Sequence, residues 1–381
     1  MDPAAGLAAE IWKRVFRFRL MPPLPQLHQL ILERDALGTT LWSSVMQPGL
    51  IDLVPDLFAD QPSARMRRIA MDLRRVGASA FVVAGSFYYL HGDRPDAAQT
   101  AGVTAMWLAQ AAAVLDYILD EEGPSRTVID AHLTADALAA ALPPPGHGGE
   151  PGRLVAWHPE LGFVMRALDH AFAGLRACFA GAVDDDYHAW LHGEVMACMQ
   201  RMTAAELASP VADLAVVRSL DDVERSLDLV NTQLTRLYAL AGVALGPPLP
   251  DARYHAVMRA ASVAGDIGWT LDALSDVESD LDHRVWSRAW LWLARSRADR
   301  GASAWRELVA DRAAALAALA ASGVIDQMLG RIDESLAELA ALPDVAPAGR
   351  AQLVDVIRLL IWSFLAPPAR AALELVGSSP A

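Results

Sequence analysis

The sequence is poor in cysteine, with only Cys178 and Cys198 among its 381 residues. Two thiols in so long a chain cannot build the disulfide framework of small secreted domains, so a reducing compartment is expected. The N-terminus also lacks a secretory signal, because an aspartate stands where basic residues are needed and no apolar stretch follows. We therefore expect a cytoplasmic protein.

Long hydrophobic runs are lacking as well. The two longest apolar stretches, 78–90 and 356–367, contain serine or arginine and fall short of the roughly 20 residues that span a bilayer. We expect no transmembrane segment, and the composition remains compatible with peripheral membrane contact. Because 54% of the residues are hydrophobic and the mean hydropathy is +0.23, the interior should be unusually apolar, and an apolar cavity is one use for it.

Basic clusters are missing too. The formal net charge is −14 and no block is rich in lysine or arginine, which excludes nucleic acid as a partner, because phosphate backbones require a basic face. GxGxxG, P-loop, GxSxG and CxxC patterns are absent, so dinucleotide, nucleotide, serine-hydrolase and dithiol sites have no basis. Part of the acidic excess lies in short clusters, for which a cation is the natural partner.

Strand patterns are also absent, since no long run alternates apolar and polar residues and alanine, leucine and arginine dominate. Proline and glycine clusters separate long stretches with wide apolar faces, which predict helices. These stretches are 97–120, 159–179, 187–208, 221–243, 251–282 and 303–342. We predict one all-α domain over residues 1–381, a bundle of long helices around an apolar active-site cavity, to which segment 1–60 is assigned less clearly.

Three aspartates recur at a spacing of four near the end of one predicted helix: Asp272, Asp276 and Asp280, here called the second ladder. Residues four apart lie on one side of a helix, where stacked carboxylates repel each other unless a cation neutralises them. Ligands that are all oxygen select hard ions such as Mg²⁺. The alternative is a solvated acidic face without a ligand.

Asp116 and Asp120 form a first ladder with the same spacing, at the C-terminal end of another predicted helix. Anions are disfavoured at that end by the helix dipole, so a bound cation or a solvated acidic tip explains them equally well. Two facing ladders could hold several Mg²⁺ ions, and a diphosphate would complete the coordination of the metals. The metals would then stabilise diphosphate as it leaves.

An allylic cation formed in this way would need an apolar cavity with aromatic faces. Trp107, Tyr117, Trp269 and Trp286 are available for cation–π contact. Each of these rings is equally compatible with ordinary core packing.

The stretch from Leu271 to Asp280 resembles the second aspartate-rich motif of the large terpene synthases related to tetraprenyl-β-curcumene synthase. The stretch 85–117 resembles the segment that leads to the first motif of that family, and the helix 234–245 is similar in character. The resemblance covers roughly residues 60–300. It implies an all-α class I terpene synthase, a lyase that ionises a linear polyprenyl diphosphate with Mg²⁺ for carbocation cyclisation or elimination.

The resemblance also implies a ligand set. It adds Glu278 to the second ladder. The first motif of the family carries further aspartates at tighter spacing, whereas Ile118 and Leu119 separate Asp116 from Asp120 here, so Glu121 is a candidate substitute. Paired DxxxD motifs are similar to those of squalene and phytoene synthases as well, which couple two prenyl diphosphates head to head.

A metal–diphosphate site also needs cationic and polar donors. Arg236 and Asn231 interrupt the apolar pattern of one predicted helix, and Arg284 and Arg288 follow the second ladder closely, so all four are candidate diphosphate ligands. A helical scaffold or lipid carrier without catalytic activity is the alternative from another class, in which both ladders are only solvated surfaces.

Overall fold

The computed structural model describes residues 7, 10–11, 13–15, 17–18, 20, 24–50, 64–121, 134–144, 162–180, 185–208, 214 and 220–377. These residues are helical or lie in turns, and none of them forms a strand. The prediction of an all-α fold is confirmed.

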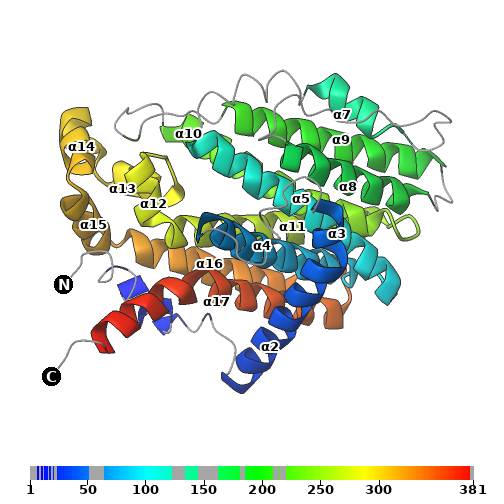
Figure 1. Cartoon of the computed structure of the whole chain (residues 1–381), viewed down its shortest axis with the longest axis horizontal. Helices are drawn as coiled ribbons and strands as arrows, with labels where there is room; N and C mark the ends of the chain where they lie inside the picture. Colours follow the sequence, from blue (N-terminus) through cyan, green and yellow to red (C-terminus); the bar gives the residue numbers. More distant parts are fainter. Residues whose placement is uncertain are drawn as a thin grey trace.

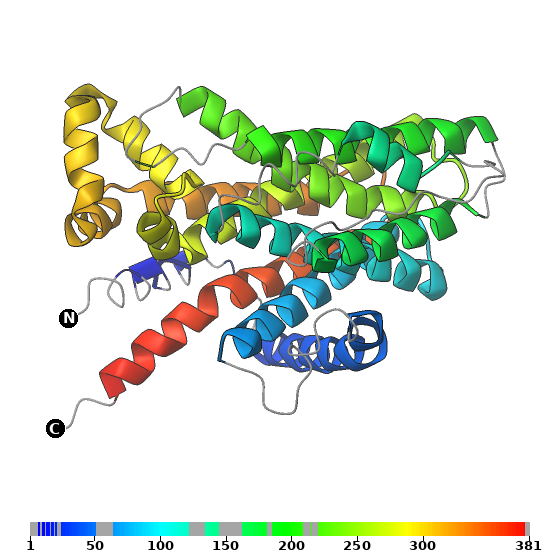
Figure 2. The same ribbon diagram turned by 45° about the horizontal axis from the view of Figure 1, so that its top comes forward.

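The helices pack together as a bundle (Figure 1). Their bounds are α2 Leu24–Leu41, η1 Trp42–Met46, α3 Gln47–Leu50, α4 Ala64–Tyr88, α5 Pro95–Glu121, α7 Ala135–Ala141, α8 Gly162–Phe179, α9 Asp185–Ala208, α10 Leu220–Val243, α11 Asp251–Ser275, α12 Val277–His283, α13 Arg288–Ser296, η4 Ala298–Arg300, α14 Gly301–Ala310, α15 Arg312–Ala321, α16 Val324–Ala341 and α17 Pro347–Gly377. Helix α10 contacts α4, α5, α9 and α11, α17 packs against α4 and α11, and α2 lies against the outside of α4 (Figure 2).

Most of the predicted helices are found where the apolar pattern placed them. Helices α5, α9 and α10 cover the predicted stretches 97–120, 187–208 and 221–243, and α8 covers the described part of 159–179. Two predictions of one continuous helix are wrong. The stretch 251–282 breaks at Asp276, and 303–342 forms the three helices α14, α15 and α16.

The extra breaks in the stretch 303–342 have local causes. Asp311 leaves the helical conformation and caps α15, because its Oδ1 accepts a hydrogen bond from the Ala314 amide at 3.1 Å. Gly323 precedes α16 with φ of 79°, a left-handed conformation that costs glycine little. An alanine-rich pattern does not reveal such breaks, since alanine suits any position of a helix.

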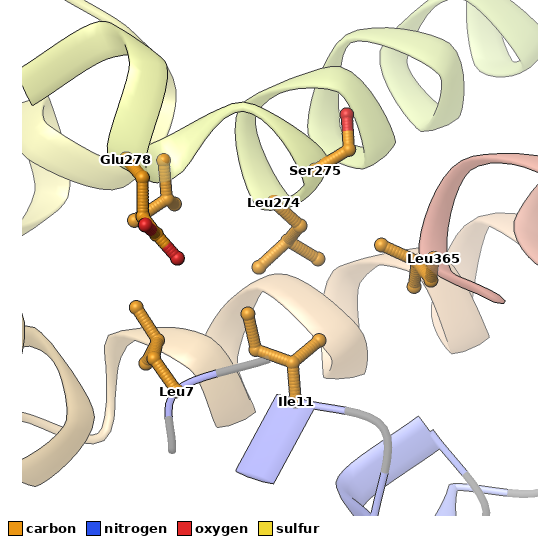
Figure 3. A pocket seen from close by; sticks show the side chains of 7 residues that line it. Leu7, Ile11, Leu274, Ser275, Glu278 and Leu365 are labelled. Atoms are coloured by element: carbon orange, nitrogen blue, oxygen red, sulfur yellow. The ribbon is translucent and has the colours of Figure 1, made fainter. Parts of the chain in front are cut away.

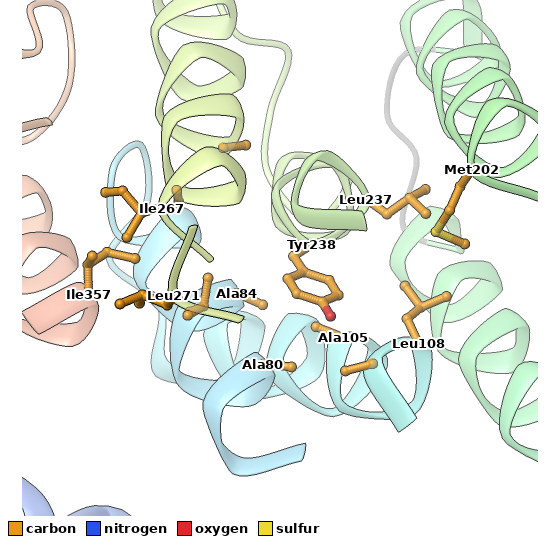
Figure 4. Close-up of a cluster of buried hydrophobic side chains, with 14 of the residues drawn as sticks. Ala80, Ala84, Ala105, Leu108, Met202, Leu237, Tyr238, Ile267, Leu271 and Ile357 are labelled. Atoms are coloured by element: carbon orange, nitrogen blue, oxygen red, sulfur yellow. The ribbon is translucent and has the colours of Figure 1, made fainter. Parts of the chain in front are cut away.

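The core between α4, α5 and α10 is built from small side chains around one large one (Figure 4). Ala80, Ala84 and Ala105 are at most 5% exposed, and Tyr238 of α10 projects between α4 and α5. Burial raises the pKa of the Tyr238 phenol, and none of the described residues forms a hydrogen bond with its hydroxyl. The interior is therefore apolar with a polar atom at its centre.

Three helix connections meet at one end of the bundle, here called the turn end. The ring of His91, between α4 and α5, lies against Gly246, between α10 and α11, where an added Cβ would be 3.8 Å from the ring. The Ala346 amide, between α16 and α17, donates to the Leu90 carbonyl at 2.9 Å. Helices α5 and α11 therefore start from the same end, and α10 runs antiparallel to α11.

Within the described residues, no individual helix has the length and apolar composition of a membrane span. The pair α15 and α16 meets both criteria only jointly, and these two helices are bent by 52° at their junction.

Candidate active site

The two ladders lie at the same height in the bundle. Asp116 stands 21 residues after Pro95, the start of α5, and Asp272 stands 21 residues after Asp251, the start of α11. At a rise of 1.5 Å per residue, each ladder begins about 32 Å from the turn end. Helix α10 lies between α5 and α11 and contacts both, so the ladders flank α10 at the opposite end of the bundle, here called the acidic end.

The first ladder is only partly described. The backbone of α5 is helical through Glu121, as the sequence predicted. The side chains of Asp116, Tyr117, Asp120 and Glu121 lie outside the described part of the structure. Their metal-binding and cavity roles remain predictions.

The second ladder spans a break between two helices. Asp276 ends α11 with φ of −106° and ψ of 10°, and α12 begins at the next residue. The amides of Asp276 and Asp280 still donate to the carbonyls of Asp272 and Asp276, at 2.9 and 2.8 Å, so the spacing of one helical turn is kept across the break. Asp272 and Asp276 are exposed, and Asp280 is half-buried.

The second ladder points away from the α4 side of the core. Ile267 and Leu271 face α4 and α17 (Figure 4). At about 100° per residue, Asp272 and Asp276 lie about 140° and 180° around α11 from Ile267. The positions of α11 that point to the core are occupied by aliphatic side chains, and a facing arrangement of the two ladders remains a prediction.

Glu278 does not share a face with the second ladder. Its Oε2 accepts from Arg312 Nη2 at 2.7 Å, and Asp282 Oδ1 accepts from Arg312 Nε at 2.9 Å. Glu278 is two positions along the chain from both Asp276 and Asp280. At about 100° per residue, this puts it on the opposite side of the helix from them. The structure therefore places Glu278 on a different face of the helix from the three aspartates, and its role as a metal ligand remains a prediction.

A small hollow lies beside Glu278, at the junction of α11 and α12 (Figure 3). It has a volume of ≈ 30 Å³ and is lined by Leu7, Ile11, Leu274, Ser275, Val277, Glu278 and Leu365. This volume suits about one or two water molecules. The hollow is thus not the predicted hydrocarbon cavity.

Arg288, a predicted diphosphate ligand, is buried between α13 and α11. Its side chain is 5% exposed, and its Nη2 donates to Asp266 Oδ1 at 2.6 Å. A second guanidinium nitrogen bonds the Thr270 hydroxyl, and the group lies 3.7 Å from the centre of the Trp269 ring. In this arrangement Arg288 fixes α13 on α11.

Arg284 occupies the end of α12 in a left-handed conformation, with φ of 59°. The Val285 amide donates to the Asp280 carbonyl at 2.7 Å, which is the hydrogen bond of a Schellman cap. The Arg284 carbonyl also accepts from the Leu214 amide at 2.8 Å. The exposed Arg284 side chain stands at the end of the second ladder, in a position where glycine is the usual residue.

Arg236 is far from the second ladder. Its Nη2 lies 3.9 Å from Glu194 Oε2, which is 3.5 Å from the Tyr254 hydroxyl. Tyr254 precedes Asp272 by 18 residues of the same helix, a distance of about 27 Å. The structure therefore does not bring Arg236 and the second ladder together. The side chain of Asn231, on the same helix as Arg236, lies outside the described part.

The predicted aromatic residues pack at helix interfaces. Trp107 is 4% exposed and stacks on His170 of α8, with ring centres 4.5 Å apart. Trp269 has Arg288 on its face, and Trp286 stacks on Trp305 at 5.8 Å. These rings fill the bundle in the structure, and their contact with a cation remains a prediction.

Sequence reasoning missed the two arginines that bind paired carboxylates at the acidic end. Arg312 binds Glu278 and Asp282, and the hydrogen bonds that it donates to these carboxylates raise the pKa of its guanidinium. Arg295 of α13 binds Asp221 and Glu224 of α10, at 2.6 and 2.7 Å. No motif or spacing in the sequence predicts these ion pairs, because each of them joins two helices that are far apart in sequence.

No family model and no curated protein matches the sequence. Solved structures do match. The polyprenyl synthase from Caulobacter crescentus CB15, complexed with calcium and isoprenyl diphosphate, has a TM-score of 0.53 at 12% identity over 90% of this chain and 98% of that chain. The chain has an isoprenoid synthase-like fold.

Two further isoprenoid synthases agree with this assignment. The geranylgeranyl pyrophosphate synthetase from Pyrococcus horikoshii matches with a TM-score of 0.51 at 14% identity, over 86% of this chain and 98% of that chain. The geranylgeranyl pyrophosphate synthase from Lactobacillus brevis matches with a TM-score of 0.50 at 15% identity, over 85% and 99%. At these identities the similarity establishes the fold alone.

Proposed function

We propose that this isoprenoid synthase-like chain is an enzyme that acts on prenyl diphosphates, and specifically a class I terpene synthase. It would ionise a linear polyprenyl diphosphate with Mg²⁺ and direct cyclisation or elimination, with release of diphosphate. The observation that carries the proposal is the equal height of the two aspartate ladders on helices that flank α10.

The donor set of the second ladder suits Mg²⁺. Asp272 and Asp276 are exposed carboxylates one turn apart. Among the described side chains, no group of three or more from histidine, cysteine, aspartate and glutamate lies close enough together to hold a metal ion, so the protein would supply one or two carboxylates to each ion. An open site is what Mg²⁺ uses, because it keeps several waters and binds through one or two carboxylates plus substrate phosphates. When bound, the metal would supply Lewis-acid stabilisation of the leaving diphosphate.

The residues of the chain would hold the substrate at both of its ends. The ladder carboxylates would orient the metal-bound diphosphate, and Arg284 at the end of α12 is the predicted cationic donor nearest to the second ladder in sequence. The alanine-lined seam between α4 and α5, the helix that carries the first ladder, would receive the hydrocarbon chain beside Tyr238 and exclude water from the cation.

A chain-elongating prenyl diphosphate synthase is the second candidate. The matched structures with TM-scores of 0.50 or more that are described above bear the names of polyprenyl and geranylgeranyl pyrophosphate synthases. Head-to-head coupling of two prenyl diphosphates is a variant of the same chemistry. These reactions consume two diphosphate substrates, whereas the proposed synthase consumes one.

The test is incubation with C10 to C35 prenyl diphosphates and Mg²⁺, followed by product analysis and measurement of released pyrophosphate. A cyclic or olefinic product from one allylic diphosphate supports the synthase. A longer diphosphate, formed only when the five-carbon homoallylic diphosphate is added, supports the elongating enzyme. If no substrate releases pyrophosphate, the scaffold alternative holds and the proposal is wrong.

A further inference from the structure

Helix α12 is a separate segment that carries part of the second ladder. The break at Asp276 separates it from α11, although the backbone hydrogen bonds from Asp276 to Asp272 and from Asp280 to Asp276 are kept, and it holds Glu278, Asp280 and Asp282 within seven residues. Like charges so close together repel each other, and a short helix has few hydrogen bonds of its own to fix its direction. Something outside α12 must therefore hold it in line with α11.

Apolar contacts anchor one face of α12, at both of its ends. Val277 and Leu281 are at most 5% exposed, and the Trp290 indole donates to the Val277 carbonyl at 3.1 Å. These contacts fix the position of the helix axis near the break. The carboxylates on the other faces of α12 are left to be fixed by other groups.

Arg312, the first residue of α15, binds both carboxylates on one side of α12. Glu278 and Asp282 are four residues apart and accept from two different nitrogens of the same guanidinium, at 2.7 and 2.9 Å. Because the guanidinium is planar and binds two carboxylates one turn apart, it restrains both the rotation of α12 and the distance of α12 from α15.

The Arg312 side of α12 is opposite to Asp280. Glu278 and Asp282 each lie two residues from Asp280, which is roughly 160° around the helix. Figure 3 shows Glu278 directed toward Leu7 and the hollow at the junction of α11 and α12. Arg312 can therefore hold α12 on the side opposite to Asp280 without covering the carboxylates of the second ladder.

We infer that Arg312 is a positioning residue that keeps Asp280 aligned with Asp272 and Asp276 by gripping Glu278 and Asp282 on the opposite face of α12. This inference rests on the proposed function, because the alignment matters only when the second ladder holds metal-bound diphosphate. Arg312 itself contacts neither the metal nor the diphosphate.

If Arg312 acts only through its charge, removing it should tighten Mg²⁺ binding, whereas if it positions the ladder, removing it should weaken Mg²⁺ binding. Loss of a positive charge at about 10 Å, across a helix and through water with salt, would tighten Mg²⁺ binding by about twofold or less. Loss of a group that orients metal ligands weakens binding by about tenfold. Lysine separates the two effects, because it keeps the charge but has no fork with which to bridge two carboxylates.

The experiment is calorimetric titration of Mg²⁺ into the full chain with inorganic pyrophosphate, for the wild type and for R312K, R312Q and R306Q. Arg306 is the matched control, an exposed arginine of α14 that donates to a carbonyl of its own helix. We expect R312K and R312Q to weaken Mg²⁺ binding by about tenfold and R306Q to leave it unchanged. Circular dichroism checks that each variant is folded.

The remaining outcomes are distinguishable. Affinities of R312K and R312Q within twofold of the wild type would overturn the inference, as would tighter binding in R312Q with R312K unchanged. If R312Q fails to fold, D282N removes the charge of one of the two carboxylates that Arg312 binds, and it should weaken Mg²⁺ binding by about threefold. If the wild type itself binds no Mg²⁺ with pyrophosphate, the proposed function fails first.

Discussion

Burial lowers the pKa of His91 from its usual 6.5 to about 4, and the charge of Arg253 acts in the same direction. The imidazole stands at the turn end, 5.2 Å from the Tyr88 ring, where the connections between helices meet. The folded chain therefore holds His91 neutral at a pH at which the unfolded chain protonates it. Stability contributed by the neutral ring is complete above pH 6.5 and is lost as the pH falls toward 4.

We predict that His91→Gln flattens this part of the pH dependence. Urea unfolding at pH 7, 6 and 5 should show the wild type losing about 2 kcal/mol more than H91Q across the window. His255→Gln, at an exposed position of α11, is the control for histidine replacement. Parallel pH profiles for the wild type and H91Q would show that His91 titrates normally.

Arg284 combines a strained backbone with a predicted role in binding diphosphate. A residue with a Cβ in the left-handed region costs about 1 kcal/mol relative to glycine. Such strain is retained where the side chain is useful, which makes Arg284 informative at the end of the second ladder.

We predict that Arg284→Gly raises the free energy of unfolding by about 1 kcal/mol and that Arg284→Ala does not. Both variants lack the guanidinium, so both should weaken pyrophosphate binding equally if Arg284 contacts the diphosphate. Denaturant unfolding and pyrophosphate titration measure the two effects separately. Unchanged pyrophosphate affinity in both variants would remove Arg284 from the site.

At the scale of helices, the sequence predicted where apolar faces run and missed where helices bend. The pattern of α11 continues through Asp276 into α12, because the residues on both sides of the break keep a spacing of four. The break is stabilised by contacts that are remote in sequence, such as the Trp290 indole on the Val277 carbonyl. Periodicity contains no information on such contacts.

Arg288 shows how a residue near a motif can serve the fold. Its guanidinium joins α13 to α11 through Asp266, which also accepts from Arg331 of α16 at 3.0 Å. Because the Arg288–Asp266 pair is largely buried, removing Arg288 leaves a desolvated carboxylate with only the half-exposed Arg331 as its counterion.

We predict that Arg288→Gln lowers the free energy of unfolding by about 3 kcal/mol, whereas Arg300→Gln, at an exposed arginine of η4, changes it by less than about 0.5 kcal/mol. Denaturant unfolding followed by circular dichroism measures both. A stable R288Q variant with weakened pyrophosphate binding would instead restore the diphosphate role that the sequence suggested.

At the scale of the whole molecule, counting residues along helices locates the acidic end. Asp116 and Asp272 stand equally far from the starts of their helices, and proline and glycine residues mark both starts in the sequence. Their equal height could therefore be predicted once a bundle was assumed. Three features could not be predicted. They are the direction of the second ladder away from α4, the distance of Arg236 from the second ladder, and the binding of Glu278 and Asp282 by Arg312. All three depend on how α10, α11 and α15 pack.

The outward direction of the second ladder raises the question of whether both ladders hold one ligand. If Mg²⁺ and pyrophosphate bridge α5 and α11 around α10, either ladder alone should bind poorly. Binding to the folded chain stabilises it by about 2.7 kcal/mol at a ligand concentration of 100 times the dissociation constant. The thermal shift produced by Mg²⁺ with pyrophosphate therefore reports the shared site.

We predict that Asp116→Asn and Asp272→Asn each abolish most of this thermal shift and that the double variant loses little more. Groups that hold one ligand together give such non-additive losses, whereas independent sites give losses that add. Asp333→Asn, at an exposed position of α16, is the control for loss of a negative charge. Additive losses would assign the ladders to separate ligands, and a full shift in D116N would reduce the metal site to α11 and α12.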